Sequence, residues 1–240
     1  MNFIKNYKEI IKLIKNRYKM LLSPYGYESG RYAIRNLDKD IKQKIQVKSP
    51  VIIDGGTNKG DLTYKFLRMY HNKCTVHCFE PIPELAKALE DKFKKFDQVT
   101  IHNKALGDEN KNISFYVTNF NPASSVLKPA EPSYTIKQTI DVDQVRLDEI
   151  LNSEIDILKL DLQGYEIQAL IGCEKLLPQT KLILTEVEFD TLYENQPLFG
   201  EVDTFLREKG FKLFNLYDIS TDENGQLSAA DALYLNKEYF

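Results

Sequence analysis

The feature that most constrains this chain is a regular alternation of short apolar runs and amphipathic segments, which begins near residue 50. The apolar runs have the length of strands, and the segments between them carry apolar residues at helical spacing. Strands and helices that alternate along a chain predict a parallel sheet with helices on both faces. The last two strand-like runs, 211–219 and 231–236, have no helix between them, so the last strand is expected to enter the sheet antiparallel.

The same pattern assigns residues 49–240 to one α/β domain built on a doubly wound sheet. The expected sheet strands are 51–53, 75–80, 99–106, 156–161, 181–189, 211–219 and 231–236. The expected helices are 61–70, one that begins at Pro83, 146–152, 167–177 and 197–210. Two further runs, 112–117 and 134–142, alternate as solvent-facing antiparallel strands do, and a loop containing Pro and Ser joins them.

Residues 1–48 are expected to form a separate N-terminal extension. Apolar residues recur there at helical spacing opposite a lysine-rich face, which predicts an amphipathic helix. This helix is expected to cover the main domain or a partner in a homodimer. Its basic face leaves peripheral contact with a membrane or a glycolipid open as an alternative. We expect neither a secretory signal nor a transmembrane segment, because no run of about 18 apolar residues exists.

Charge and cysteine content narrow the functional classes. The formal net charge of −3 argues against a dedicated nucleic-acid-binding protein, which would carry a basic excess. The three cysteines have no disulfide-framework spacing, which favours a reducing, cytoplasmic location. Cys74, His77 and Cys78 lie close together, but alternate side chains of a strand point to opposite faces. They are therefore interpreted as buried strand residues rather than as a zinc site.

A glycine-rich turn follows the first expected strand, in the stretch DGGTNKG at 54–60. Glycines at such a turn let the backbone bend sharply and approach a ligand closely. The stretch is not a Walker A phosphate loop, because no Gly-Lys-Ser/Thr closes it, and it is not the dinucleotide fingerprint G-x-G-x-x-G. The sequence therefore indicates a nucleotide site that is not built for phosphate.

Two acids indicate the kind of ligand. Asp54 ends the first strand, where it would repel a pyrophosphate but would pair with a cationic amino-acid moiety. Glu80 ends the second strand, where a carboxylate is placed to accept hydrogen bonds from both ribose hydroxyls. Together they favour S-adenosylmethionine (SAM), which carries an ammonium and a sulfonium and no phosphate.

From about residue 50 to the C-terminus, the chain resembles the FkbM family of SAM-dependent methyltransferases. The motifs that carry the resemblance stand in order as DGGTNKG, FEPIP, NKALGD, LKLDLQGYEIQALIGCEKLL and LTEVEF. The resemblance implies a Rossmann-like class I methyltransferase fold with seven strands, SAM as cofactor and S-adenosylhomocysteine as product. The residues expected to contact or shape the cofactor site are Asp54, Gly55, Gly56, Thr57, Asn58, Gly60, Glu80, Pro81, Asn103, Lys104, Ala105 and Asp161.

Carboxylates at the ends of two later strands are the candidates for catalysis. The ligands of a doubly wound sheet gather at the carboxyl ends of its strands, which places Asp161 across from Asp54. Glu166 opens the next helix, and Glu186 ends the following strand. We expect Asp161, Glu186 and Glu166 to serve as base or acceptor ligands. A capping role for Asp161, a backbone-binding role for Glu166 and a divalent metal held by Asp161 and Glu186 stay open.

Two loops are expected near the acceptor. The loop with Ser124 and Ser125 matches a serine-rich segment of the family and is expected to fold over the acceptor. The aromatic stretch 193–199 is expected either to stack on a sugar face or to pack in the core.

The sequence thus predicts a SAM-dependent O-methyltransferase that acts on a hydroxyl of a carbohydrate or glycan, because members of the resembled family mainly methylate hydroxyl groups. Two other classes stay open: an NAD(P)-dependent oxidoreductase and a non-catalytic interaction module with the same fold. The acidic turn argues against the first, and the intact Asp54, Glu80 and Asp161 argue against the second.

Overall fold

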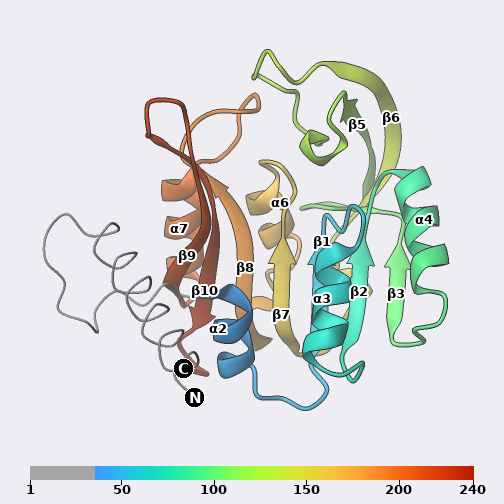
Figure 1. Cartoon of the computed structure of the whole chain (residues 1–240), viewed down its shortest axis with the longest axis vertical. Helices are drawn as coiled ribbons and strands as arrows, with labels where there is room; N and C mark the ends of the chain where they lie inside the picture. The colour runs from blue at the N-terminus through green and yellow to red at the C-terminus, as the bar shows by residue number, and fades with distance from the viewer. Residues whose placement is uncertain (1–35) are drawn as a thin grey trace, which may run out of the picture. The chain divides into compact units, whose positions relative to one another are not determined.

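Seven strands form the main sheet of the part of the chain that the computed structural model describes, residues 36–240 (Figure 1). In spatial order they are β3 (Val99–His102), β2 (Thr75–Phe79), β1 (Val51–Gly55), β7 (Ile155–Leu160), β8 (Thr180–Glu188), β10 (Leu227–Asn236) and β9 (Phe211–Thr221). Strands β1, β2, β3, β7 and β8 pair in parallel, whereas β10 is antiparallel to both of its neighbours. This confirms the expected α/β class and the antiparallel last strand. Strand order reverses between β1 and β7, the usual place for a ligand site.

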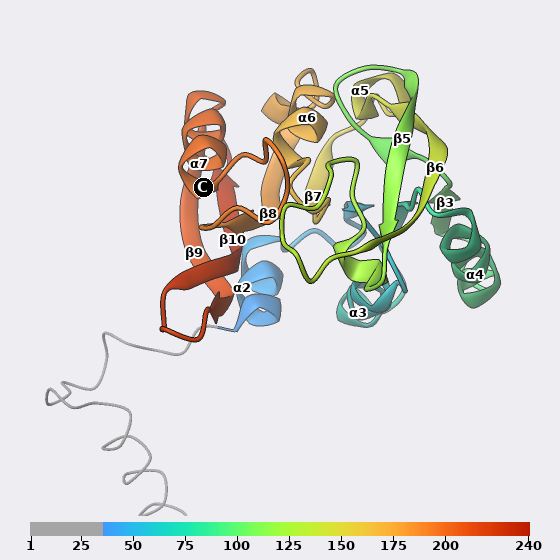
Figure 2. The same cartoon turned by 90° about the horizontal axis from the view of Figure 1, so that it is seen from above.

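Helices cover both faces of the main sheet, as Figure 2 shows from above. They are α2 (Leu37–Lys44), α3 (Asp61–Met69), α4 (Pro83–Phe93), α5 (Leu147–Ile150), α6 (Glu166–Ile171) and α7 (Phe199–Glu208). Helices α2, α3 and α4 pack into one core cluster, through Ile41, Phe66 and Leu89 respectively. Leu170 and Leu206 bury α6 and α7 in the other. Burial of these apolar side chains is the main stabilising contribution to the three-layer arrangement.

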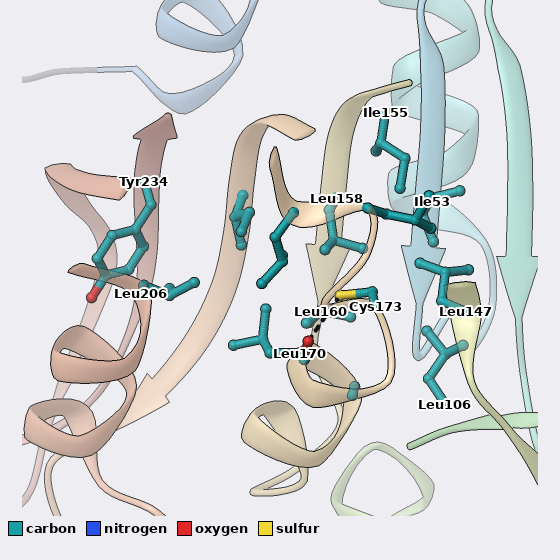
Figure 3. Close-up of a cluster of buried hydrophobic side chains, with 14 of the residues drawn as sticks. Ile53, Leu106, Leu147, Ile155, Leu158, Leu160, Leu170, Cys173, Leu206 and Tyr234 are labelled. Atoms are coloured by element: carbon teal, nitrogen blue, oxygen red, sulfur yellow. Dashed lines mark hydrogen bonds between the residues drawn. The ribbon is translucent and has the colours of Figure 1, made fainter. Parts of the chain in front are cut away.

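The core between the sheet and α6 is drawn in Figure 3, where side chains from β1 and β7 meet those of the helix layer. Ile53, Leu158 and Leu170 are fully buried there. All six residues of β7 are buried, as expected for a central parallel strand with both faces covered. This makes β7 a rigid base for whatever lies at its carboxyl end.

A smaller sheet lies at the edge where the parallel strands end, near the top of Figure 1. It contains β4 (Ala105–Leu106), β6 (Ile136–Val145) and β5 (Lys111–Thr118) in that order. The expected antiparallel pairing of the two alternating runs is observed between β5 and β6. The single strand expected at 99–106 is wrong, because the chain bends after His102 and β4 joins the smaller sheet. Asn103 stabilises this bend by donating hydrogen bonds to the carbonyls of Glu80 and Pro81, at 2.9 and 3.0 Å.

Helix α6 is shorter than the expected helix 167–177. The carbonyl of Gly172 accepts a hydrogen bond from Asp148 N at 3.0 Å, which directs this carbonyl to another segment of the chain. A Cβ at Gly172 would also lie 1.8 Å from the carbonyl oxygen of Gly107. The chain then turns into a short 3₁₀ helix, η2 (Leu177–Gln179).

The segment 36–48, which the sequence pattern groups with the N-terminal extension, packs within the main unit. Ile41 and Ile45 are each 1% exposed, and Tyr217 donates a hydrogen bond to Asp40 at 2.8 Å. The amphipathic helix expected farther upstream lies outside the described residues. Among residues 36–240, the structure contains no helix with the length and apolar character that a membrane crossing requires.

His77 and Cys78 are residues of β2, as expected, whereas Cys74 lies just before this strand. Cys74 and Cys78 are buried free thiols. His77 Nδ1 lies 3.2 Å from His102 Nε2 on the adjacent strand, and both rings are partly buried. Burial, followed by the charges of His77 and Lys104, lowers the pKa of His102 to about 4.

The substitution His102→Gln should therefore make the protein more stable relative to the wild type as the pH falls. The unfolded wild type takes up the His102 proton near pH 6.5, whereas the folded wild type resists it until about pH 4. The free energy of unfolding of the wild type therefore falls across this pH window because of His102. Glutamine does not titrate, so the variant does not undergo this decrease. Urea denaturation of both proteins at about pH 7.5 and about pH 5 measures the difference, and a difference that does not change with pH would contradict the assignment.

Candidate active site

A cavity of about 470 Å³ lies at the carboxyl ends of the parallel strands, beside the smaller sheet. Gly56, Glu80, Asp161 and Glu186 line it, and they come from the ends of β1, β2, β7 and β8. A second cavity of about 410 Å³ shares Gly56, Asn58, Pro122 and Asp161 with the first. The two cavities therefore meet at the glycine turn and Asp161, where strand order reverses.

Close packing against β7 determines the shape of the glycine turn. Gly56 has φ +71°, and a Cβ there would lie 1.9 Å from the carbonyl oxygen of Asp161. The amides of Gly56 and Thr57 donate to the carbonyl of Phe79 at 3.0 and 3.1 Å, which joins the turn to β2. At Gly60, also left-handed, a Cβ would collide with the side chains of Leu89 and Phe93. A side chain at Gly56 would displace the backbone, and one at Gly60 would displace two side chains of α4 and strain a left-handed conformation.

Asp54 does not line either cavity, contrary to its expected role as the partner of a ligand cation. Its side chain is fully buried beneath the turn, where Thr63 Oγ1 donates to Oδ2 and Lys159 Nζ lies 3.2 Å from Oδ1. The internal ion pair already compensates the charge of Asp54, so this acid supports the turn from behind.

Lys159 is a functional residue that the sequence pattern does not reveal. Its ammonium donates to the carbonyls of Gly55 and Gly56 at 3.1 and 2.9 Å, and lies 3.7 Å from Asp161 Oδ2. Burial alone lowers the pKa of Lys159, but the charges of Asp54 and Asp161 outweigh burial and hold it above its usual value. A charged lysine therefore clamps the end of β1 to the end of β7. In the sequence, the position of Lys159 two residues before Asp161 is the feature that could have indicated this role.

Glu80 lies where the sequence places it, at the rim of the first cavity. Its two carboxylate oxygens accept hydrogen bonds from Asn58 N at 2.8 Å and Ile82 N at 3.0 Å. Burial raises the pKa of Glu80 to about 7. Asn58 Oδ1 is buried and, within residues 36–240, has no hydrogen-bond partner. A ligand that donates hydrogen bonds would satisfy this atom. A nucleoside carries such donors, so the unpartnered oxygen fits a bound nucleoside.

The wall beside Glu80 is apolar and has the composition expected for an adenine pocket. Pro81, Lys104 and Ala105 line the first cavity as expected, together with Ile82, Leu85 and Phe115. Thr57 lines the second cavity. Gly55, Gly60 and Asn103 line neither cavity and act on the shape of the turn and the strand ends instead.

Asp161, Glu186 and Glu188 converge on the other side of the first cavity. Burial, followed by the charges of Asp161 and Glu188, raises the pKa of Glu186 well above its usual value. Burial and the charges of Glu166 and Asp161 also raise the pKa of Glu188. The pair Asp161 and Glu186 is thus brought together as expected, in surroundings that favour proton uptake by Glu186.

Glu166 does not take part in this convergence. It is 1% exposed, does not line the cavity, and accepts a hydrogen bond from Leu162 N at 2.7 Å. Its carboxylate accepts hydrogen bonds at the turn before α6, away from the cavity where the expected catalytic role would place it. The alternative, a backbone-binding role, is what the geometry shows.

Gln163 is a second residue that sequence reasoning missed. Its side-chain nitrogen donates to Asp161 Oδ1 at 2.8 Å and also to Glu186. Its oxygen accepts a hydrogen bond from the Tyr193 hydroxyl at 2.8 Å. The amide therefore joins the two carboxylates of the pair.

The loop between β5 and β6 lines the cavity through Phe120, Ser124 and Val126, among others. Ser124 Oγ accepts from Thr118 N at 3.1 Å, and Ser125 Oγ donates to the carbonyl of Gln163 at 2.7 Å. Both serines therefore hold the loop in place. The stretch 193–199 does not supply a stacking surface at Tyr193, which is fully buried. Tyr134, at the loop's far end, is the aromatic residue that lines the cavity instead.

The described residues hold no ready metal centre. Across 36–240, no group of three or more His, Cys, Asp or Glu side chains has the arrangement needed to hold a metal ion. The Asp161 and Glu186 carboxylates both accept hydrogen bonds from Gln163.

The sheet order, the antiparallel last strand and the acid-rimmed cavity at the switch point together define the class I fold of SAM-dependent methyltransferases. The sequence matches the model of the methyltransferase FkbM domain over residues 54–213. The chain therefore belongs to the FkbM methyltransferase family.

Three known proteins illustrate the relationship. The 2-O-methyltransferase NoeI of Sinorhizobium fredii is 28% identical over 182 residues, which cover 69% of this chain and 74% of NoeI. The crystal structure of the methyltransferase FkbM from Methylobacillus flagellatus aligns with a TM-score of 0.54 at 13% identity, over 78% of this chain and 44% of that protein. An rRNA methylase from Streptococcus thermophilus aligns with a TM-score of 0.50 at 9% identity, over 85% of this chain and 99% of that one. The two structures support the fold alone.

Replacing Lys159 with Met should lower the free energy of unfolding by about 3–5 kcal/mol, because Asp54 is then buried without its counter-ion. Adding Asp54→Asn should recover part of this loss, which urea denaturation of the two single variants and the double variant measures. Lys87→Met is the matched control, since Lys87 pairs with Glu90 on the surface and its replacement should leave stability nearly unchanged. Strictly additive effects of the two buried substitutions would contradict the ion pair.

Proposed function

We propose that this chain is a SAM-dependent O-methyltransferase that transfers a methyl group to a hydroxyl of an uncharged carbohydrate. One observation carries the proposal: a single cavity has Glu80 and an apolar wall on one side and the Asp161–Glu186 pair on the other. The glycine turn at Gly56 lies between them and leaves space for a ligand that reaches from one to the other.

The residues that would hold SAM are those of the turn and its surroundings. Glu80 would accept hydrogen bonds from the ribose hydroxyls, and Ile82, Leu85 and Ala105 would enclose the adenine. Asn58 Oδ1 offers a buried acceptor without a partner in the described part of the chain. SAM would supply a methyl group bonded to a positively charged sulfur. Such a ligand suits a cavity whose wall carries several carboxylates.

The chain's own residues would position and deprotonate the acceptor. An alcohol is a weak nucleophile near neutral pH, so its oxygen must lose a proton as it forms the new bond to carbon. Asp161 and Glu186 line the cavity and are the groups available to take that proton. Burial raises the pKa of Glu186, which makes its carboxylate a stronger proton acceptor than an exposed one.

The acceptor class follows from the charge of the cavity. In their ionised forms, Asp161, Glu186 and Glu188 would repel an anionic acceptor, whereas they would accept hydrogen bonds from neutral hydroxyl groups. Tyr134 adds an aromatic face of the kind that packs on sugars. The relative NoeI is named a 2-O-methyltransferase, which supports transfer to oxygen. An NAD(P)-dependent oxidoreductase is less compatible, because the dinucleotide pyrophosphate would meet the same carboxylates.

The substitution Glu80→Gln should weaken SAM binding by at least about tenfold, because the carboxylate that would hold the ribose loses its charge. Glu84→Gln is the matched control, since Glu84 is exposed in the first turn of α4. Isothermal titration of both variants and the wild type with SAM and with NADH measures the effect. Binding of NADH without SAM would contradict the proposed function.

Paired neutral and anionic acceptors test the acceptor class. We expect methylation of methyl glucoside to exceed that of methyl glucuronide by at least about tenfold in kcat/KM, because the carboxylates of the cavity wall repel the uronate. Transfer from labelled SAM to a panel of such neutral and anionic methyl glycoside pairs measures this, with and without EDTA. Preference for the anionic members would contradict the charge argument. Loss of turnover in EDTA would show that the transfer depends on a divalent cation.

A further inference from the structure

Gln163 lies in a turn and has a left-handed backbone conformation, which is unfavourable for a residue with a side chain. It has φ +56° and is followed by Gly164 at φ +90°. The surroundings must therefore stabilise this conformation. Ser125 Oγ does so by donating to the Gln163 carbonyl at 2.7 Å. The loop that lines the cavity therefore fixes the place of this glutamine.

The amide group of Gln163 makes a three-way contact. Its nitrogen carries two hydrogens, one for Asp161 Oδ1 at 2.8 Å and one for Glu186. Its oxygen accepts from the hydroxyl of the fully buried Tyr193. Because ionised carboxylates can only accept hydrogen bonds, the nitrogen faces them and the oxygen faces the Tyr193 hydroxyl, whose single hydrogen is shared between this oxygen and a second acceptor. Tyr193 Oη also lies 3.0 Å from the carbonyl of Ala123 in the loop.

This contact addresses a physical problem of the site. Two ionised carboxylates at the wall of one cavity repel each other, and neither can donate a hydrogen bond while ionised. The two hydrogens of Gln163 offset that repulsion and hold both carboxylates toward the same space. A fixed arrangement matters because a displacement of about 1 Å in a catalytic site can cost a hundredfold in rate.

We propose that Gln163 is a positioning residue for the methyl transfer: its amide holds Asp161 and Glu186 as the pair that receives the acceptor hydroxyl, and Tyr193 sets the orientation of the amide. This inference rests on the proposed function. It adds a residue that acts through the two carboxylates, and it links their geometry to the loop between β5 and β6.

The substitution Gln163→Glu is the most selective test. Glutamate has nearly the same shape and still accepts from Tyr193, but it presents an oxygen instead of a donor to the two carboxylates. We expect kcat to fall about tenfold to a hundredfold while the KM for SAM stays within about twofold. Gln138→Glu is the matched control, because it adds the same charge at an exposed position of β6. An equal loss in that control would show a general charge effect and overturn the proposal.

A double-mutant cycle tests the role of Tyr193. Tyr193→Phe removes the orienting hydroxyl and should lower kcat less than Gln163→Met, which removes the whole amide. Combining the two should be no worse than Gln163→Met alone, since the hydroxyl then has no amide to orient. Additive losses would contradict the orienting role. If Gln163→Glu fails to fold, the kcat of Gln163→Met shows whether the Gln163 amide positions the two carboxylates.

The wild type separates this inference from the proposed function. Calorimetry with SAM and methylation of the neutral methyl glycoside that the wild type turns over fastest report on the function itself. If the wild type does both and Gln163→Glu keeps wild-type kcat, the positioning role is overturned and the function stands. If the wild type binds no SAM and methylates none of the glycosides, the proposed function is overturned.

Discussion

The buried ion pair between Lys159 and Asp54 is the contact on which the rest of the site depends. The two residues are direct partners in the register of β1 and β7, the strands on either side of the switch point. The same ammonium also binds the carbonyls of Gly55 and Gly56, so one side chain holds the glycine turn against the end of β7. The turn in turn leaves no room for a Cβ beside Asp161. The position of the catalytic candidate Asp161 is thus coupled to the position of the cofactor turn.

Because Lys159 compensates the charge of Asp54 inside the protein, the acids of the site fall into two groups. The acid beneath the turn is compensated, whereas Glu80, Glu186 and Glu188 face the cavity and have raised pKa values through burial. Burial therefore favours proton uptake by the acids of the cavity wall, whereas Asp54 is paired with the Lys159 ammonium beneath it. That division agrees with a cationic cofactor and a neutral acceptor, and it explains why carboxylates gather where an oxidoreductase would need to bind phosphate.

Much of the fold was predictable because it follows from local patterns. Apolar runs and their spacing predicted the main strands and helices, and the missing helix before residues 231–236 predicted the antiparallel strand. The errors come from contacts between distant segments. The run 99–106 breaks because Asn103 binds carbonyls of the preceding strand end, and the helix from Glu166 ends early because Gly172 packs on Gly107. Neither contact leaves a periodic trace in the sequence.

The candidate site was predictable in its residue types and strand ends, but not in the partners of each side chain. The sequence by itself determined that Glu80, Asp161 and Glu186 meet at one edge, because the carboxyl ends of parallel strands share that edge. Only the tertiary structure decided which acids face the cavity. Asp54 and Glu166 are turned to Lys159 and to backbone amides, while Gln163 is turned to the carboxylates. The physical reason is that a buried charge or donor must find a partner, and the nearest partner depends on packing between segments far apart in the chain.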